Sequence, residues 1–425
     1  SDFDDIDIYK NIKGTDWQEK MFSDVAQYSK YYNVSVNGGS DKTQTNLSYT
    51  HNEDDGLIKT SGYTRDNLTL KLNHQIFSNL KIEFNSRFSN SVTNGAGTSG
   101  SSDLRISDLI TARPVNGLAD YIDFSNSNNL DDEEYQKLLE GLILPTEKVK
   151  QDYRLKTSKS FNMNGAITWN VVKGVVFRSE YGVNYSFGLS KRYWGPLTGK
   201  SRNDGYNLPL GQRTASEGNS YRLANTLTYN LRRSIHSMNF MIGQEANSSS
   251  YSSQDMTGIR FPLGISPERL FANFAKGEIL TQSTNVSADD RMFSYFGRAN
   301  YSLMDKYIVN VTLRADGSTK FAPGKQWGYF PAASAAWRMS EENFIRDLPF
   351  ITDLKLRASY GEAGNNRMDN DMWRYIYSIS NSRTVGYGET INPYYRPGSV
   401  MPNPDLKWET TVTQNVGIDF SLWKD

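Results

Sequence analysis

Apolar and polar residues alternate along most of this chain, and residues 291–339 show the pattern most clearly. Phe293 and Tyr295 fall in one phase, while Arg298 and Asn300 fall in the other. Alternation with a period of two is the signature of a β-strand with one apolar and one polar face. The stretch therefore predicts three consecutive antiparallel strands of about ten residues each, the length that a tilted strand needs to cross a membrane.

The same alternation recurs from about Tyr31 to the end of the chain. Leu70 is followed by Lys71, and Phe84 is preceded by Glu83, so charged residues stand at internal positions of long strands. Such residues need a wet face, which a water-filled lumen provides. Counting these segments predicts about thirteen strands.

The links between the predicted strands alternate between tight turns and long excursions. The tight turns fall near Asp41, Ser78, Lys173, Arg233 and Asp305. The large loops are expected at about 95–157, 195–216, 252–290 and 362–406. Short links on one rim and long loops on the other are typical of an up-and-down outer-membrane barrel, whereas Greek-key sandwiches do not keep two rims apart. The predicted fold is thus an all-β, antiparallel transmembrane β-barrel with long extracellular loops and short periplasmic turns.

An open sheet of thirteen strands leaves two unpaired edges, which are costly in hydrocarbon, and bacterial single-chain barrels use even strand numbers. We therefore expect residues 30–425 to form part of a larger barrel and residues 1–29 to be an extracellular loop segment. One strand is expected before Ser1 and more after Asp425, and no plug domain is expected within this chain.

Composition excludes several other classes. The chain has 425 residues, no cysteine, and 47 basic against 47 acidic side chains, which is not the profile of a nucleic-acid-binding or disulfide-stapled protein. No apolar run approaches the length of a transmembrane helix, and no signal peptide is evident at Ser1.

Catalytic and metal-binding signals are weak. His51, His74 and His236 are scattered without a spacing that would join them as metal ligands or as a general base beside a serine. An acidic cluster within residues 2–7 lacks the glycine and terminal glutamate of a calcium loop. We expect no enzyme activity and no cofactor, and any calcium would belong to an accompanying subunit or to a loop.

Aromatic residues gather in the last long loop. They are Trp373, Tyr375, Tyr387, Tyr394 and Tyr395, with Arg396 beside them. Aromatic faces with nearby polar groups suit sugar rings or peptide side chains, so these six residues are the predicted substrate contacts. The alternative is that they pack the loop against itself or against a lid protein. A short amphipathic helix is also predicted near Tyr135 to Leu142 in the first large loop.

Several long blocks resemble one family. They are SYFGRANYSLMDKYIVNVTLRADGSTKFAPGKQWGYFPAASAAWRMSEENF, ITDLKLRASYGEAGNN and NPDLKWETTVTQNVGIDFSL, with TDWQEKMF, YNVSVNGGSDKTQTNLSYT and DDGLIKTSGYTRDNLTLKLN earlier in the chain. They resemble the barrel region of SusC/RagA-type TonB-dependent transporters of Bacteroidota, and they cover most of the predicted strands.

The resemblance implies a 22-stranded, plugged barrel in the outer membrane. It implies import of oligosaccharides or peptides driven by TonB, which would act through a plug or TonB-contacting segment outside this chain. The implied partners are a SusD-like surface lipoprotein that closes the barrel as a lid, the cargo, and outer-membrane lipid; a dimer of transporter–lid pairs is left open. A passive porin and a soluble β-rich glycan-binding or adhesin module remain the alternatives.

Overall fold

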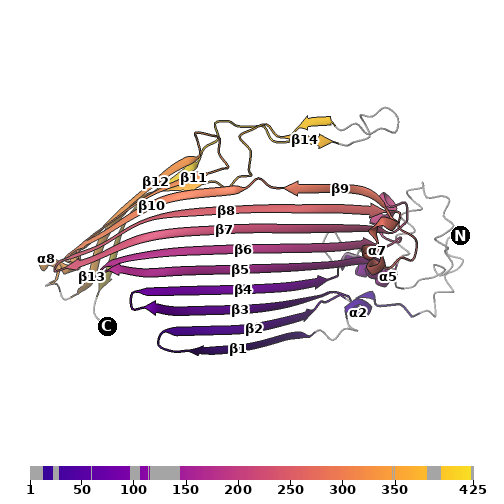
Figure 1. Cartoon of the computed structure of the whole chain (residues 1–425), viewed down its shortest axis with the longest axis horizontal. Helices are drawn as coiled ribbons and strands as arrows, with labels where there is room; N and C mark the ends of the chain where they lie inside the picture. The colour runs from indigo at the N-terminus through magenta and orange to yellow at the C-terminus, as the bar shows by residue number, and fades with distance from the viewer. Residues whose placement is uncertain are drawn as a thin grey trace.

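One large antiparallel sheet makes up most of this chain in the computed structural model (Figure 1). The structure describes residues 13–22, 28–58, 60–95, 106–112, 114, 144–346, 348, 350–380 and 394–422. Strands that follow one another in sequence pair with one another, and β9 alone branches from this path by pairing with β8. Without β9, the 14-stranded sheet follows a path of thirteen strands, which confirms the expected number.

The strands of the path are 11 to 24 residues long. The strands are β1 (Ser29–Gly39), β2 (Thr43–Asp55), β3 (Gly62–Phe77), β4 (Leu80–Asn94), β5 (Asp152–Val172), β6 (Val175–Trp194), β7 (Leu210–Arg233), β8 (His236–Ile259), β10 (Asp290–Leu303), β11 (Tyr307–Ser318), β12 (Trp327–Arg338), β13 (Ile351–Asn365) and β16 (Glu409–Leu422). The helices are α2 (Trp17–Phe22), α3 (Ile106–Thr111), α5 (Pro145–Gln151), α6 (Gly199–Asp204), α7 (Pro267–Ala272), η3 (Phe274–Lys276), η4 (Met339–Glu341) and α8 (Asn343–Arg346). None of the described helices has the length and apolar character to cross a membrane.

The sheet is open in the described chain. Its two outermost strands are β1 and β16, which do not pair with each other. Part of an up-and-down barrel has these features: antiparallel strands that neighbour one another in sequence order, and two free edges. The expected fold class is therefore confirmed.

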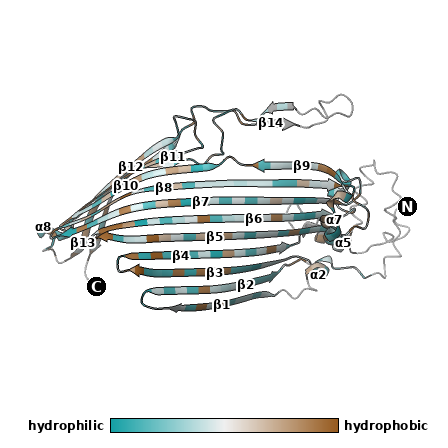
Figure 2. Cartoon of the chain, in the orientation of Figure 1, coloured by the Kyte–Doolittle hydropathy of each residue, from teal (hydrophilic) through white to brown (hydrophobic). Residues whose placement is uncertain are grey.

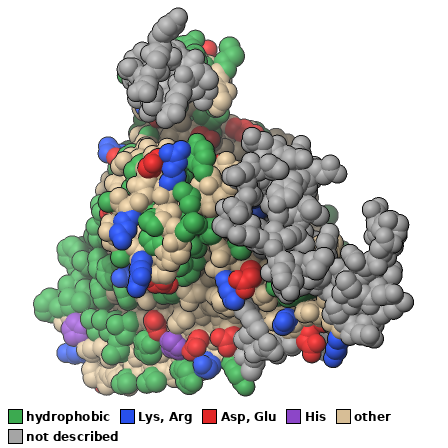
Figure 3. Space-filling model, turned by 90° about the vertical axis from the view of Figure 1, so that its right-hand side faces the viewer, with side chains coloured by type: hydrophobic (Ala, Val, Ile, Leu, Met, Phe, Trp, Pro, Cys, Tyr) green, Lys and Arg blue, Asp and Glu red, His purple; other side chains and the backbone are tan. Residues whose placement is uncertain are grey.

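Hydrophobic side chains cover one face of this sheet and are not buried by other described parts of the chain. Register partners lie on the same face, so Tyr301, Val309 and Ala335 form one row across β10, β11 and β12. Leu70, Val309 and Ile418 remain 41%, 42% and 62% exposed. Hydropathy alternates along the strands in Figure 2, and in Figure 3 hydrophobic side chains gather on one flank of the molecule. This face is the one that would contact lipid.

The two ends of the strands differ as predicted from their spacing. Tight turns join the strands at one end, which we call the turn end, and the longer connections lie at the other, which we call the loop end. At the turn end, β5 and β6 are joined by a tight turn in which Gly174 has φ +84°. A Cβ at Gly174 would lie 2.4 Å from the carbonyl oxygen of Asn230, so only glycine fits this turn. At the loop end, the chain makes the long excursions that carry α5, α6, α7 and η3.

Two packed hydrophobic clusters lie at the loop end, around the ends of β6, β7 and β8. Phe261 and Leu270 are 0% exposed and pack with Tyr193 and the partly buried Phe274. A neighbouring cluster contains Trp194, Leu210 and Ile259. The connection carrying α7 and η3 is thereby folded onto the ends of β6, β7 and β8.

Four expected loop boundaries differ from the structure because the strands continue beyond the apolar band. β5 begins at Asp152, β7 begins at Leu210, and β13 continues to Asn365. The expected loop at 252–290 contains the end of β8 and the whole of β9 (Glu278–Val286), and the expected loop at 362–406 contains a hairpin of β14 (Tyr377–Ser380) and β15 (Tyr394–Pro397). Strand ends outside hydrocarbon need no apolar face, so their sequences, such as EILTQSTNV, lack the alternation that predicts a strand. The helix expected near 135–142 lies outside the described residues.

The tryptophans are only partly where an interfacial girdle would place them. Tyr307 and Trp337 stack at the turn end, with ring centroids 6.4 Å apart and planes at 15°. Trp194, in contrast, is buried in the loop-end core, and Trp408 packs against Phe321 and Phe330. These two tryptophans therefore pack against other parts of the protein.

Glu342, in the connection between β12 and β13, gives a pH-dependent prediction. Its carboxylate accepts hydrogen bonds from Tyr307 Oη (2.6 Å) and Trp337 Nε1 (3.2 Å), and Lys306 Nζ lies 3.4 Å away. These contacts, the tyrosine bond first, hold the pKa of Glu342 below its usual value. A carboxyl with a lowered folded-state pKa contributes stability that is present above its unfolded pKa, about 4.3, and is lost as the pH falls through the folded value.

We therefore expect Glu342→Gln to lower the unfolding temperature in detergent at pH 7 and to have a smaller effect at pH 3. Thermal unfolding across this pH range measures the difference. Glu341→Gln is the matched control, because the ion pair of Glu341 with Arg338 is long, at 3.7 Å. A Glu342→Gln protein with the same pH dependence as the parent would contradict the assignment.

Candidate functional site: the polar face of the sheet

A row of alternating charges crosses the polar face of the sheet from β4 to β8. Arg178 on β6 donates to Glu83 on β4 and to Glu180 on its own strand, at 2.7 Å each. Arg222 on β7 donates to Glu180 (3.2 Å) and to Glu245 on β8 (3.0 Å). We call the set Lys81, Glu83, Arg178, Glu180, Arg222 and Glu245 the charge ladder. Each arginine bridges two carboxylates, so the ladder is electrically balanced.

The ladder side chains are partly exposed rather than buried. Relative exposure of the side chain is 30% for Glu83, 37% for Arg178 and 48% for Arg222. Ion pairs of this exposure contribute little stability one by one. Their position shows instead that this face of the sheet meets water, because six charges in one row would be too costly against lipid.

A second, more buried pair extends the charged row to β11. Arg314 Nε donates to both carboxylate oxygens of Asp316, at 2.8 and 2.9 Å, and its Nη2 donates to Ser294 Oγ at 2.9 Å. Asp316 and Ser294 are 6% and 0% exposed. The guanidinium carbon of Arg314 also lies 5.5 Å from the Phe296 ring centroid.

Nearer the loop end, the polar face is hollowed and lined by amides. The hollow has a volume of about 450 Å³. Its polar lining includes Asn162, Asn164, Asn184, Ser220, Asn247 and Asn366, with the ion pair of Asp290 and Lys320 at its edge. Carboxamides both donate and accept hydrogen bonds. The amide hollow can therefore bind neutral groups such as sugar hydroxyls or peptide bonds.

Within the described part of the chain, none of the predicted substrate contacts lines this hollow. Trp373 and Tyr375 precede β14, and Tyr375 is 72% exposed. Tyr394, Tyr395 and Arg396 lie on β15, where Tyr395 is 73% exposed. The side chains of Tyr394 and Arg396 and the whole of Tyr387 lie outside the described residues. The β14–β15 hairpin stands apart from the large sheet in Figure 1, and Trp373, Tyr375 and Tyr395 do not line the amide hollow.

The histidines lie in three separate places. His51 Nδ1 is 2.8 Å from Asp66 Oδ1, His74 contacts Thr43, and His236 lies 2.9 Å from the Tyr301 hydroxyl. Within the described part of the chain, no group of three or more histidine, aspartate or glutamate residues is arranged to hold a metal ion. The acidic cluster at residues 2–7 lies outside the described residues.

Comparison with known proteins decides the family. Residues 146–425 match the family described as "TonB dependent receptor-like, beta-barrel". The chain belongs to this family. It is a family of outer-membrane transport proteins and not of enzymes, so the protein is an outer-membrane β-barrel protein and its polar face lines the lumen.

Two curated relatives cover nearly the whole chain. The TonB-dependent receptor SusC of Bacteroides thetaiotaomicron is 27% identical over 96% of this chain and 40% of its own length. The TonB-dependent receptor P39 of Formosa agariphila is 28% identical over 92% of this chain and 35% of its own length. The resemblance to SusC/RagA-type transporters is thereby confirmed. The chain spans about two fifths of the length of these relatives.

A solved structure supports the fold. The structure of the RagAB peptide transporter superimposes with a TM-score of 0.74 at 19% identity, covering 96% of this chain and 44% of that one. At this identity the likeness shows the fold alone. The open sheet described above corresponds to part of that longer chain.

Proposed function

We propose that this chain forms part of the wall of a TonB-dependent importer of oligosaccharides or peptides that works with a SusD-like surface lipoprotein. The similarity to SusC across 96% of the chain supports it, as does the fold shared with a structure described as a peptide transporter. TonB would act through a plug or TonB-contacting segment outside this chain.

The amide hollow is the observation that carries this proposal. It lies on the lumen face near the loop end, where cargo enters a barrel of this kind. Its carboxamides match neutral, hydrogen-bonding cargo, whereas a receptor for a highly charged ligand would be expected to present unpaired charges there. The loop residues Trp373, Tyr375, Tyr387, Tyr394, Tyr395 and Arg396 remain predicted contacts for the same cargo before it reaches the lumen.

Uptake by cells that express the full-length transporter tests the proposal. We expect import of labelled oligosaccharides or peptides to stop when the proton-motive force is dissipated, because energy for this class arrives through TonB. A passive porin is the competing function, and undiminished uptake in de-energised cells would favour it.

Replacing both Asn164 and Asn184 with leucine is expected to lower uptake at limiting cargo by about thirtyfold, because two hydrogen bonds of about 1 kcal/mol each are lost. The same substitution at Asn300 is the matched control, since Asn300 lies on the lumen face of β10 toward the turn end and bonds Asn239. An Asn300→Leu protein as impaired as the double variant would show that the loss is structural. Uptake unchanged in the double variant would remove the amide hollow from the cargo path.

A further inference from the structure

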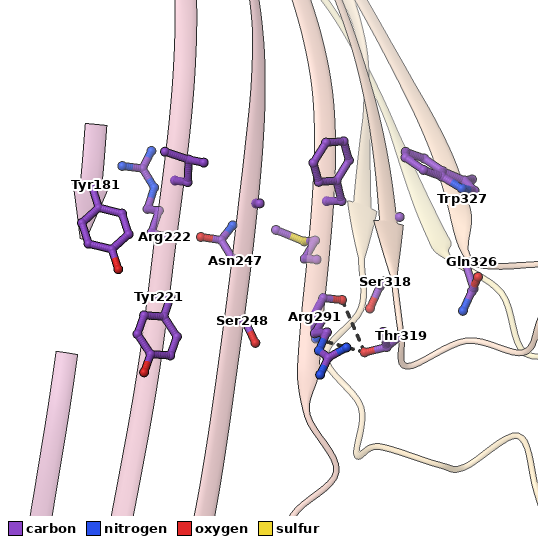
Figure 4. A pocket seen from close by; sticks show the side chains of 15 residues that line it. Tyr181, Tyr221, Arg222, Asn247, Ser248, Arg291, Ser318, Thr319, Gln326 and Trp327 are labelled. Atoms are coloured by element: carbon purple, nitrogen blue, oxygen red, sulfur yellow. Dashed lines mark hydrogen bonds between the residues drawn. The ribbon is translucent and has the colours of Figure 1, made fainter. Parts of the chain in front are cut away.

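The lipid-facing surface carries a separate hollow of about 600 Å³ (Figure 4). Tyr181, Leu223, Ala246 and Phe293 are successive register partners on β6, β7, β8 and β10, so they share a face. That face is the apolar one, because Phe293 pairs with Gly317 in the same phase as Val309. The hollow is therefore on the outside of the barrel and is distinct from the amide hollow in the lumen.

Large and small residues together shape this outer hollow. Ala246 and Ser248 are the small residues of β8, and Tyr181 and Tyr221 stand on one side of them. Phe293 and Trp327 stand on the other side. We call this region the outer groove.

The aromatic wall of the outer groove is held in place by its neighbours. A Cβ at Gly317 would lie 3.0 Å from the Trp327 ring, so glycine allows the indole to lie across β11. Trp327 stacks on Tyr295 at 6.3 Å, and Tyr295 meets Phe293 edge to face at 4.9 Å. The rings of Trp327, Tyr295 and Phe293 therefore hold one another in position and form this wall before any ligand binds.

The outer groove lies at the level of the outer leaflet. Tyr307, in the turn-end aromatic pair, and Gly317 are ten residues apart on β11. At about 3.4 Å per residue and a tilt of about 40°, this segment rises about 26 Å. The apolar band of such barrels is about 25 Å tall, so Gly317 and Trp327 stand at the extracellular interface.

The positively charged side chain of Arg291 lies at the extracellular end of the groove. The side chain of Arg291 is 64% exposed, and its backbone N–H donates to Thr319 Oγ1 at 3.0 Å. In Figure 4 the Tyr181 and Tyr221 hydroxyls point toward the same end of the strands as Arg291. Asp289 pairs with one guanidinium nitrogen at 2.5 Å, which leaves other N–H donors of the guanidinium for an anion.

We propose that the outer groove binds an acyl chain of an outer-leaflet lipid whose phosphorylated head group reaches Arg291. An apolar hollow below a cation, at the membrane interface, complements an anionic lipid and not a soluble ligand. Because lipid tails are as apolar as the barrel wall, close packing and the ion pair must supply the selectivity. A lipid held there would fix β8 and β10 at the point where β9 leaves the barrel.

Native mass spectrometry of the purified full-length transporter tests the proposal, with bisphosphorylated lipid A and dephosphorylated lipid A as probes. We expect about one bound lipid A per transporter. Ala246→Trp fills the groove with an apolar side chain that the membrane tolerates and should reduce this occupancy at least about tenfold. Arg291→Gln should remove the preference for the phosphorylated probe.

Ala299→Trp is the matched control, because Ala299 is also on the lipid-facing side of β10 but does not line the groove. It should leave lipid binding unchanged. Equal occupancy in the parent and Ala246→Trp proteins would overturn the proposal, as would an equal loss in Ala299→Trp. A change of oligomeric state in Ala246→Trp with lipid occupancy unchanged would assign the groove to a second copy of the chain and would also overturn it.

Discussion

Phe261→Ala is expected to lower the free energy of unfolding by about 3–5 kcal/mol, the range for removing a fully buried phenylalanine. Phe261 is 0% exposed and meets Phe274 edge to face, with ring centroids 5.3 Å apart. Alanine would leave a cavity beneath α7 and η3 that the surrounding strand ends cannot close. Denaturant titration of the protein in detergent measures the loss.

Leu263→Ala serves as the control in the same connection. Leu263 is 66% exposed, so its truncation should change stability by no more than about 0.5 kcal/mol. Limited proteolysis adds a local measurement, since loss of the Phe261 cluster should expose residues 260–277 to cleavage first. A Phe261→Ala protein that unfolds at the parent's denaturant concentration would show that this core does not stabilise the loop end.

The sequence predicts the barrel strands well because the membrane imposes a simple pattern on them. On β11, Val309, Val311 and Leu313 face lipid, while Asn310 and Thr312 face the lumen, and no other described part of the chain covers the apolar row. Beyond the apolar band this constraint ends. The end of β8 and the whole of β9 pair through backbone hydrogen bonds while carrying serine, threonine and glutamine on both faces. Their extent therefore cannot be predicted from hydropathy.

The candidate site also has one part that alternation predicts and one part that it does not. Alternation places Glu83, Arg178 and Glu180 on the polar face, and this part of the prediction agrees with the structure. The sequence does not show that Arg178 reaches Glu83, because the two residues are 95 positions apart and the contact depends on the register of β4, β5 and β6.

The amide hollow cannot be predicted from the sequence for a related reason. Single asparagines on several strands give no local motif, and they form one surface only when register aligns Asn164 with Gly182 and Arg222 with Asn247. The loop aromatics, in contrast, are close together in sequence and can be recognised from it. Their proximity in sequence points to the hairpin, whereas the amide hollow forms on the lumen wall from residues far apart in sequence.

Arg314→Met is expected to cost about 3 kcal/mol of unfolding free energy, because it leaves the Asp316 carboxylate without its guanidinium partner. The Asp316 side chain is 9% exposed, whereas that of Arg314 is 35% exposed. Water from the lumen can therefore reach the site, which places the cost at the lower end of the range for broken buried pairs. Denaturant titration compares this variant with the parent protein.

The double variant Arg314→Met and Asp316→Asn should recover most of this loss, because the buried charge is then absent. Arg357→Met is the matched control: Arg357 also faces the lumen, but it is 58% exposed and its partner Asp419 is 38% exposed, so the cost should be below about 1 kcal/mol. Equal losses in Arg314→Met and Arg357→Met would mean that burial does not distinguish the two pairs. A double variant no more stable than Arg314→Met would mean that Arg314 acts through packing on Phe296 and its bond to Ser294, and not through the Asp316 charge.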